Sequence, residues 1–159
     1  MNQRSDITFT AAQVEALEHR LHQDIPLSVA MGVTVRSVDA NVLTLHAPLA
    51  PNHNHKGTLF GGSVYSLAVL AAWSWLYVNT QAQGMDGHIV IQGGSIEYPL
   101  PVSGDGLGIC HPVTEEAWAR FAQTFARRGK ARINVSSVVR GEGGAADAAR
   151  FAGVFVLHR

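Results

Sequence analysis

The hydrophobic and polar positions divide the chain into one long apolar segment and several shorter alternating ones. No charged side chain and no histidine lies between Gly57 and Met85, and the pattern predicts a central helix over residues 59–80. Apolar side chains occur on every side of this helix, so we expect it to be buried all round, by protein or by lipid. Glycine and serine in its first turns make it a weak membrane span, and we expect the protein's own sheet to cover it.

Two kinds of element are predicted before the central helix. Thr10 and Gln13 form a capping-box pattern that opens an N-terminal helix, and Pro26 ends it, so this helix lies within residues 1–25. Alternating segments joined by a short Asp-Ala-Asn turn then predict a hairpin, with strands at Val33–Val38 and Val42–Ala47.

Four strands and one more helix are predicted after the central helix. Gly93 and Gly94 interrupt the first of these strands and predict a bulge. Thr114 is expected to cap the inserted helix, and Gly129 is expected to end it. The four strands are expected at His88–Tyr98, Leu107–Val113, Ala131–Arg140 and Ala149–His158.

This order predicts an α+β fold in which a mostly antiparallel sheet curls round one apolar helix. The chain has 159 residues without repeats, linkers or low-complexity tracts, so we expect one domain over residues 1–159. Trp73, Trp75, Tyr77 and Cys110 are expected in its core.

The composition of the chain makes some classes of function less plausible than others. The formal net charge is zero, which argues against a nucleic-acid partner. A single cysteine permits no intramolecular disulfide, and the first ten residues lack the apolar core of a signal peptide. We therefore expect a cytoplasmic protein that binds neither nucleic acid nor membrane.

Candidate chemistry gathers where a polar loop meets the start of the central helix. Exposed N–H groups at a helix N-terminus bind negative charge, and two adjacent glycines, Gly61 and Gly62, let a bound group approach the backbone. The loop carries two asparagines and two histidines in alternation, Asn52, His53, Asn54 and His55. This spacing is not that of a zinc site, and we predict no metal.

The element order and the run PNxNxxxTxFGGSxYSL resemble the hotdog-fold thioesterase family whose members include malonyl-acyl-carrier-protein decarboxylases. The resemblance implies an antiparallel sheet wrapped round the central helix, and a homodimer with the site at its interface. It implies an acyl-thioester substrate carried by the phosphopantetheine of acyl carrier protein or coenzyme A, and no separate cofactor.

A missing acid distinguishes between the possible reactions. Broad hotdog thioesterases carry the loop Asn-x-x-Gly-x-x-His-Gly-Gly and an acidic residue one or two turns into the helix. Here Asn54 and Gly57 match, but Phe60 stands at the histidine position and Val69 at the acidic position. Hydrolysis needs a group that activates water, whereas decarboxylation needs only stabilisation of an enolate. We therefore favour malonyl-thioester decarboxylation.

Each candidate residue has a structural alternative. Asn54 is predicted to hydrogen-bond the thioester or the malonyl carboxylate, and the alternative is a turn-capping asparagine. Gly61 and Gly62 are predicted to supply the oxyanion site. Thr58 either caps the helix or contacts the substrate. The remaining predicted substrate contacts are Asn52, His53, His55, Phe60, Ser63, Tyr65 and Ser66.

Two other functions remain open at this stage. One is an acyl-CoA or acyl-carrier-protein thioesterase that uses His53, His55 or a residue of the second subunit. The other is a non-catalytic module that binds acyl thioesters.

Overall fold

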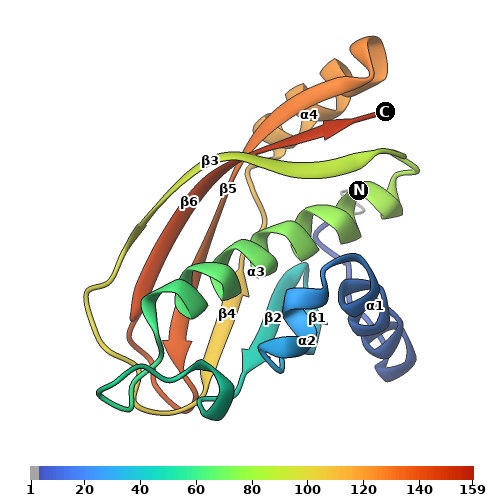
Figure 1. Cartoon of the computed structure of the whole chain (residues 1–159). Helices are drawn as coiled ribbons and strands as arrows, with labels where there is room; N and C mark the ends of the chain where they lie inside the picture. Colours follow the sequence, from blue (N-terminus) through green and yellow to red (C-terminus); the bar gives the residue numbers. More distant parts are fainter. Residues whose placement is uncertain (1–3) are drawn as a thin grey trace.

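A six-stranded antiparallel sheet curls round one long helix in the computed structural model, which describes residues 4–159 (Figure 1). The strand order is β1-β2-β4-β5-β6-β3, so β1 and β3 are the edge strands. The elements are α1 Ala11–Asp24, α2 Pro26–Ala30, β1 Thr34–Asp39, β2 Val42–Ala47, a 3₁₀ turn Ala50–Asn52, α3 Gly61–Ala82, β3 His88–Glu97, β4 Gly106–Cys110, α4 Glu115–Arg128, β5 Lys130–Gly141 and β6 Ala149–His158.

Local sequence signals place most of these elements. Thr10 forms both halves of its capping box with Gln13, and Gly129 ends α4 in the left-handed region as predicted. The β1–β2 turn holds Ala40 and Asn41 at positive φ, 48° and 59°. Pro26 does more than end α1, because it is the first residue of the short helix α2.

Most of α3 is buried against the inner face of the sheet. Trp75 and Leu76 are 1% and 0% exposed, and glycines on β4 let the helix come close. A Cβ at Gly108 would lie 3.0 Å from Leu67 and 3.1 Å from its carbonyl oxygen, so this strand must be nearly bare where the helix crosses it.

The expectation that α3 is buried all round is wrong for one stripe of the helix. Val69, Trp73 and Tyr77 are half-buried and face a groove beside β3. Trp73 stacks on Tyr77 and donates its indole N–H to the carbonyl of Ile89 at 3.2 Å. The apolar pattern could not show this stripe, because groove-lining and core-facing residues are equally apolar.

Within residues 4–159, α3 alone is long and apolar enough to cross a membrane, and over half of its most apolar window is buried in the protein. The sheet therefore covers most of this apolar helix, as the sequence predicted. Cys110 lies in this core as expected, and its burial raises the pKa of the thiol.

A buried polar network fixes the far half of α3. Asn79 and Asn41 exchange amide hydrogen bonds at 3.0 and 3.1 Å, and the Trp75 indole donates to the Asn41 carbonyl at 3.0 Å. Because each buried amide has a partner, the network sets the position of the helix along the sheet at little cost.

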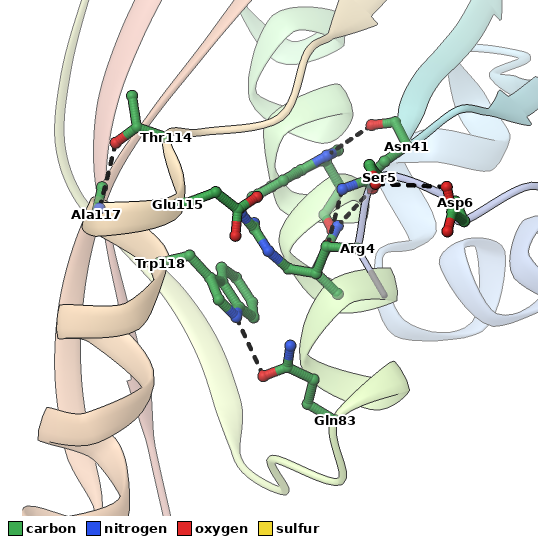
Figure 2. Close-up of polar contacts among 11 residues, drawn as sticks. Arg4, Ser5, Asp6, Asn41, Gln83, Thr114, Glu115, Ala117 and Trp118 are labelled. Carbon is green, nitrogen blue, oxygen red and sulfur yellow. Dashed lines mark hydrogen bonds and ion pairs between the residues drawn. The ribbon is translucent and has the colours of Figure 1, made fainter. Parts of the chain in front are cut away.

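The N-terminal segment and α4 close the end of the sheet near the C-terminus of α3 (Figure 2). Arg4 is 3% exposed, pairs with Glu115 at 2.9 Å and lies 4.7 Å from the Trp118 ring centroid. Trp118 in turn donates to the side chain of Gln83 at 3.1 Å, just after α3. These contacts join three segments that are distant in sequence.

The edge strand β3 is the most exposed part of the sheet. It pairs only with β6, and its register shifts between Ile91 and Gly93, where the sequence predicted a bulge. Val90 and Ile91 are 46% and 41% exposed. A long edge strand with exposed apolar side chains is a surface suited to pairing with another strand.

Candidate functional site

The N-terminus of α3 has no side-chain cap. Phe60 occupies the N-cap position, and the first helical bond is the one from Val64 N–H to the Phe60 carbonyl at 2.9 Å. In the part of the chain that the structure describes, the backbone N–H groups of residues 61–63 therefore have no intramolecular acceptor. They present three aligned donors at the positive end of a 22-residue helix dipole.

Thr58 does not cap this helix, so that expectation is wrong. Its hydroxyl oxygen accepts a hydrogen bond from the Asn54 side-chain amide at 2.8 Å. The side-chain Oδ1 of Asn54 also accepts from the backbone N–H groups of Lys56 and Thr58, at 2.9 and 3.2 Å. Asn54 therefore holds the loop in shape, which is the structural alternative considered for it. Its catalytic role stays a prediction.

The other polar residues of the loop divide by burial. Asn52 is 2% exposed and donates to the carbonyls of Met31 and Pro48, both at 2.8 Å. Its burial and these bonds show that it shapes the loop, and its assignment as a substrate contact stays a prediction. His53 and His55 are exposed, and a ring nitrogen of His53 lies 3.0 Å from the Asn54 carbonyl.

Of the two glycines, only Gly62 has a close neighbour, since a Cβ at Gly61 would lie 3.6 Å from Tyr98, an ordinary contact distance. A Cβ at Gly62 would lie 2.4 Å from the ring of Phe60, which is itself 56% exposed. Phe60 thus forms one wall beside the helix N-terminus and supplies no acid or base. Gly61 accepts a hydrogen bond at its carbonyl from the Tyr98 hydroxyl at 2.9 Å.

Tyr98 is a site residue that sequence reasoning missed. It follows β3 directly and reaches back to the first residue of α3, and partial burial, then the nearby Tyr65, raise the pKa of its hydroxyl. It therefore stays protonated at neutral pH and able to donate a hydrogen bond. A tyrosine between a strand and a proline gave no local signal of this contact.

An apolar groove runs along α3 and β3, beginning at Tyr65 in the second turn of the helix. Its first part is a pocket of about 330 Å³ that contains Tyr65, Ser66 and Val69. A second pocket of about 640 Å³ shares Val69, Leu70 and Ile91 with the first and continues toward Trp73 and Tyr77. The two pockets together form a path that suits an elongated apolar group.

Tyr65 and Ser66 face this groove as predicted substrate contacts would. The Tyr65 ring packs edge-on against Phe151 with centroids 5.5 Å apart. The Ser66 hydroxyl donates to the Gly62 carbonyl at 2.9 Å, as a helical serine commonly does, and no base activates it. Ser63 is half-buried in the first turn. No carboxylate lies on α3 to activate water.

Comparison with known proteins identifies the family. The model of the family described as "Putative thioesterase (yiiD_Cterm)" matches residues 14–159. The chain belongs to this family. A protein of unknown function from Chlorobaculum tepidum TLS is 32% identical, with 99% of this chain and 100% of that chain covered and a TM-score of 0.87.

Two further solved structures share this hotdog fold. A protein described as a "putative thioesterase" from Shewanella oneidensis is 28% identical, and its TM-score is 0.81. The match covers 94% of this chain and 100% of that chain. A "probable thioesterase" from Pseudomonas aeruginosa, at 19% identity, covers 91% of this chain and 94% of its own with a TM-score of 0.76, and shows the fold alone. These findings support an enzyme of the hotdog thioesterase superfamily.

A polar cluster behind the family's loop motif was also missed from sequence. Asp105 accepts from the Leu49 N–H at 2.8 Å and lies 3.0 Å from a ring nitrogen of His46. Glu142 lies 3.6 Å from the same imidazole and pairs with Arg36 at 2.8 Å. The cluster fixes the strand ends from which the loop departs. Arg36 offsets the charge of Glu142 within this cluster.

Replacing Asn54 by alanine is expected to destabilise the loop of residues 54–58. The change removes three hydrogen bonds from a half-buried side chain, so the free energy of unfolding should fall by about 1–2 kcal/mol. Urea unfolding measures this, with exposed Lys56→Ala as the control. An Asn54→Ala protein as stable as the wild type would show that the loop does not depend on these bonds.

Asp105 is expected to make stability depend on acid pH. The Leu49 N–H, then the His46 side chain, lower the pKa of its carboxyl group in the folded state. The stabilisation is therefore present above the unfolded-state pKa and is lost as the pH falls through the lowered value. Melting temperatures between neutral and acid pH should fall less steeply for Asp105→Asn than for the wild type. Asp86→Asn, in an exposed loop, is the control and should keep the wild-type slope.

Proposed function

We propose that this protein binds an acyl thioester with its carbonyl oxygen at the N-terminus of α3 and decarboxylates a malonyl thioester there. One observation supports this most: three uncapped backbone donors lie in the turn that precedes the groove-lining residues Tyr65 and Ser66, on a helix that carries no acid and no base. Such a helix end can stabilise negative charge on an oxygen, and α3 itself offers no side chain that activates water.

The reaction requires only what these residues supply. The bond between the malonyl α-carbon and its carboxylate breaks, and carbon dioxide leaves. The electron pair moves into the thioester as an enolate, whose oxygen accepts hydrogen bonds from the N–H groups of Gly61 and Gly62. The α-carbon then takes a proton from water to give the acetyl thioester. Removal of one donor of this type typically costs about 2.7–4 kcal/mol in the barrier.

Tyr98 and Phe60 assist by position. The hydrogen bond from the Tyr98 hydroxyl to the Gly61 carbonyl oxygen orients the peptide group that also contains the Gly62 N–H. Phe60 stands beside the first turn of the helix as an apolar wall against which a bound acyl group can pack.

Thioester hydrolysis is the second candidate function. The family description favours it, and the groove extends beyond the space that a malonyl group fills. The base would be His53, His55 or a group from a second subunit. This candidate function predicts a substrate whose long apolar acyl chain lies along Val69 and Trp73.

We also propose a homodimer formed by the edges of two β3 strands. The exposed Val90 and Ile91, and the absence of lysine or proline within His88–Glu97, leave this edge unprotected in one protomer. A two-fold axis makes the paired strands antiparallel, so each β3 covers the groove of the other protomer from the side.

No resident cofactor is needed, because the phosphopantetheine arrives with the carrier protein or coenzyme A. We place the activity in the cytoplasm.

Product analysis tests the proposed reaction. After incubation with malonyl-acyl-carrier protein, mass spectrometry should show a loss of carbon dioxide and formation of acetyl-carrier protein. Asn54→Ala should reduce this turnover at least about tenfold, since the loop before Gly61 loses its shape. Appearance of the free phosphopantetheine thiol instead would establish hydrolysis. An intact substrate, tested with longer acyl chains as well, would favour a binding module.

Val69→Asp separates the two candidate reactions. Because Val69 lines both pockets and is half-buried, the variant is expected to fold. The new carboxylate supplies a base on the groove, so acyl-CoA hydrolysis should rise while decarboxylation does not. Val69→Asn is the matched control. A melting temperature far below that of the control would show that the groove is dry and closed.

A further inference from the structure

Five cations form an exposed patch at the end of the molecule opposite the N-terminus of α3. This basic patch consists of Arg127, Arg128, Lys130, Arg132 and Arg159. It lies where α4 ends, β5 begins and β6 ends, near the C-terminus in Figure 1. The formal charge of the whole chain is zero, so the patch reflects a separation of charge and not a generally basic protein.

No acidic side chain on the neighbouring sequence neutralises this patch. The chain has no Asp or Glu between Glu116 and Glu142, and none after Asp147. Among residues 4–159, the ion pairs of the protein use other cations, such as Arg36, Arg140 and Arg150. The patch therefore keeps its positive field in solution.

The basic patch contains a hollow. A hollow of about 690 Å³ is lined by Arg127, Arg128, Lys130, His158 and Arg159, with Gly129 between them. The Arg159 guanidinium lies 4.9 Å from the Phe125 ring centroid, and its backbone N–H donates to the Gly129 carbonyl at 2.9 Å. The last residue is thereby held beside the helix end.

Strand pairing connects the patch to the β3 edge. Lys130 pairs with His158, and His158 pairs with His88, the first residue of β3. The patch thus begins about 10 Å, or two strand spacings, from the free edge. The candidate site of the same protomer is far away, because α3 alone spans about 33 Å.

The proposed dimer brings the patch close to a site. Antiparallel pairing of two β3 strands sets the His88 end of one strand beside the Glu97 end of the other. Tyr98 follows Glu97 and contacts Gly61, so the basic patch of each protomer flanks the candidate site of its partner. The site and the patch that serves it would belong to different chains.

We propose that this basic patch docks an acidic carrier protein, whose phosphopantetheine arm then enters the site of the adjacent protomer. This inference rests on the proposed acyl-thioester function and names its partner. All five cations are exposed, and they extend over the ends of two strands and a helix. A broad, solvated, positive surface complements an acidic protein face, whereas a small anion is better held by buried, converging donors.

Charge reversal at the patch tests the proposal with three substrates that share one acyl group. The variant is Arg127→Glu, and the control is Arg120→Glu, the same charge change about two turns earlier on the same face of α4. Turnover is measured on the thioester of carrier protein, of coenzyme A and of pantetheine. We expect KM for the carrier-protein substrate to rise about tenfold in the variant and much less in the control. The other two substrates should be little affected, and kcat should be unchanged for all three.

Two kinetic results would contradict the docking surface. An equal rise in KM for carrier-protein and coenzyme A substrates would mean that the patch binds phosphate groups and not a protein face. Unchanged kinetics with all three would show that the patch has no part in binding. Affinity for carrier protein that lacks phosphopantetheine, measured by calorimetry at low and high salt, separates docking from chemistry. If wild-type protein turns over no thioester but binds this carrier protein through Arg127, the proposed reaction fails and the docking surface stands. No binding by the wild type would overturn the docking surface itself.

Discussion

The burial of α3 inside the curled sheet is the constraint on which the rest of the structure depends. A helix with no charge over its whole length must be covered, and five strands and two glycines of β4 accommodate it. The Asn41–Asn79 pair then fixes its position. Because the far end is held by the sheet and α4, the near end can present unpaired backbone donors to a substrate.

The loop before α3 is organised by its own side chains. Asn54 holds residues 54–58 in a closed turn, Asn52 anchors the preceding 3₁₀ turn, and Asp105 holds the Leu49 N–H. None of these interactions caps the helix. The sequence motif thus shapes a rigid approach to the helix N-terminus and leaves the N–H groups of Gly61 and Gly62 available for a thioester oxygen.

Much of the fold was predictable because its signals are local. The capping box at Thr10, the left-handed Gly129 and the alternation in β2 and β5 depend on neighbouring residues, and the structure agrees with them. The resemblance to hotdog thioesterases rested on the Gly61-Gly62 motif, and the family match confirms it.

The site was less predictable because its decisive contacts are tertiary. The bond between Tyr98 and Gly61 joins residues 37 apart, and that between His46 and Asp105 joins residues 59 apart. No periodicity reveals such pairs. The groove-facing stripe on α3 was also hidden, since Val69 and Trp73 differ from core residues only in what lies opposite them.

Backbone amide signals of the ¹⁵N-labelled protein test the central claim most directly. A malonyl-pantetheine analogue with an amide in place of the thioester keeps the carbonyl oxygen and cannot react by thioester cleavage. On titration, the amide resonances of Gly61, Gly62 and Ser63 should shift strongly, because their N–H groups bind that oxygen. Shifts confined to His53, His55 or the far end of the groove, with the glycine signals unchanged, would contradict a thioester site at the N-terminus of α3.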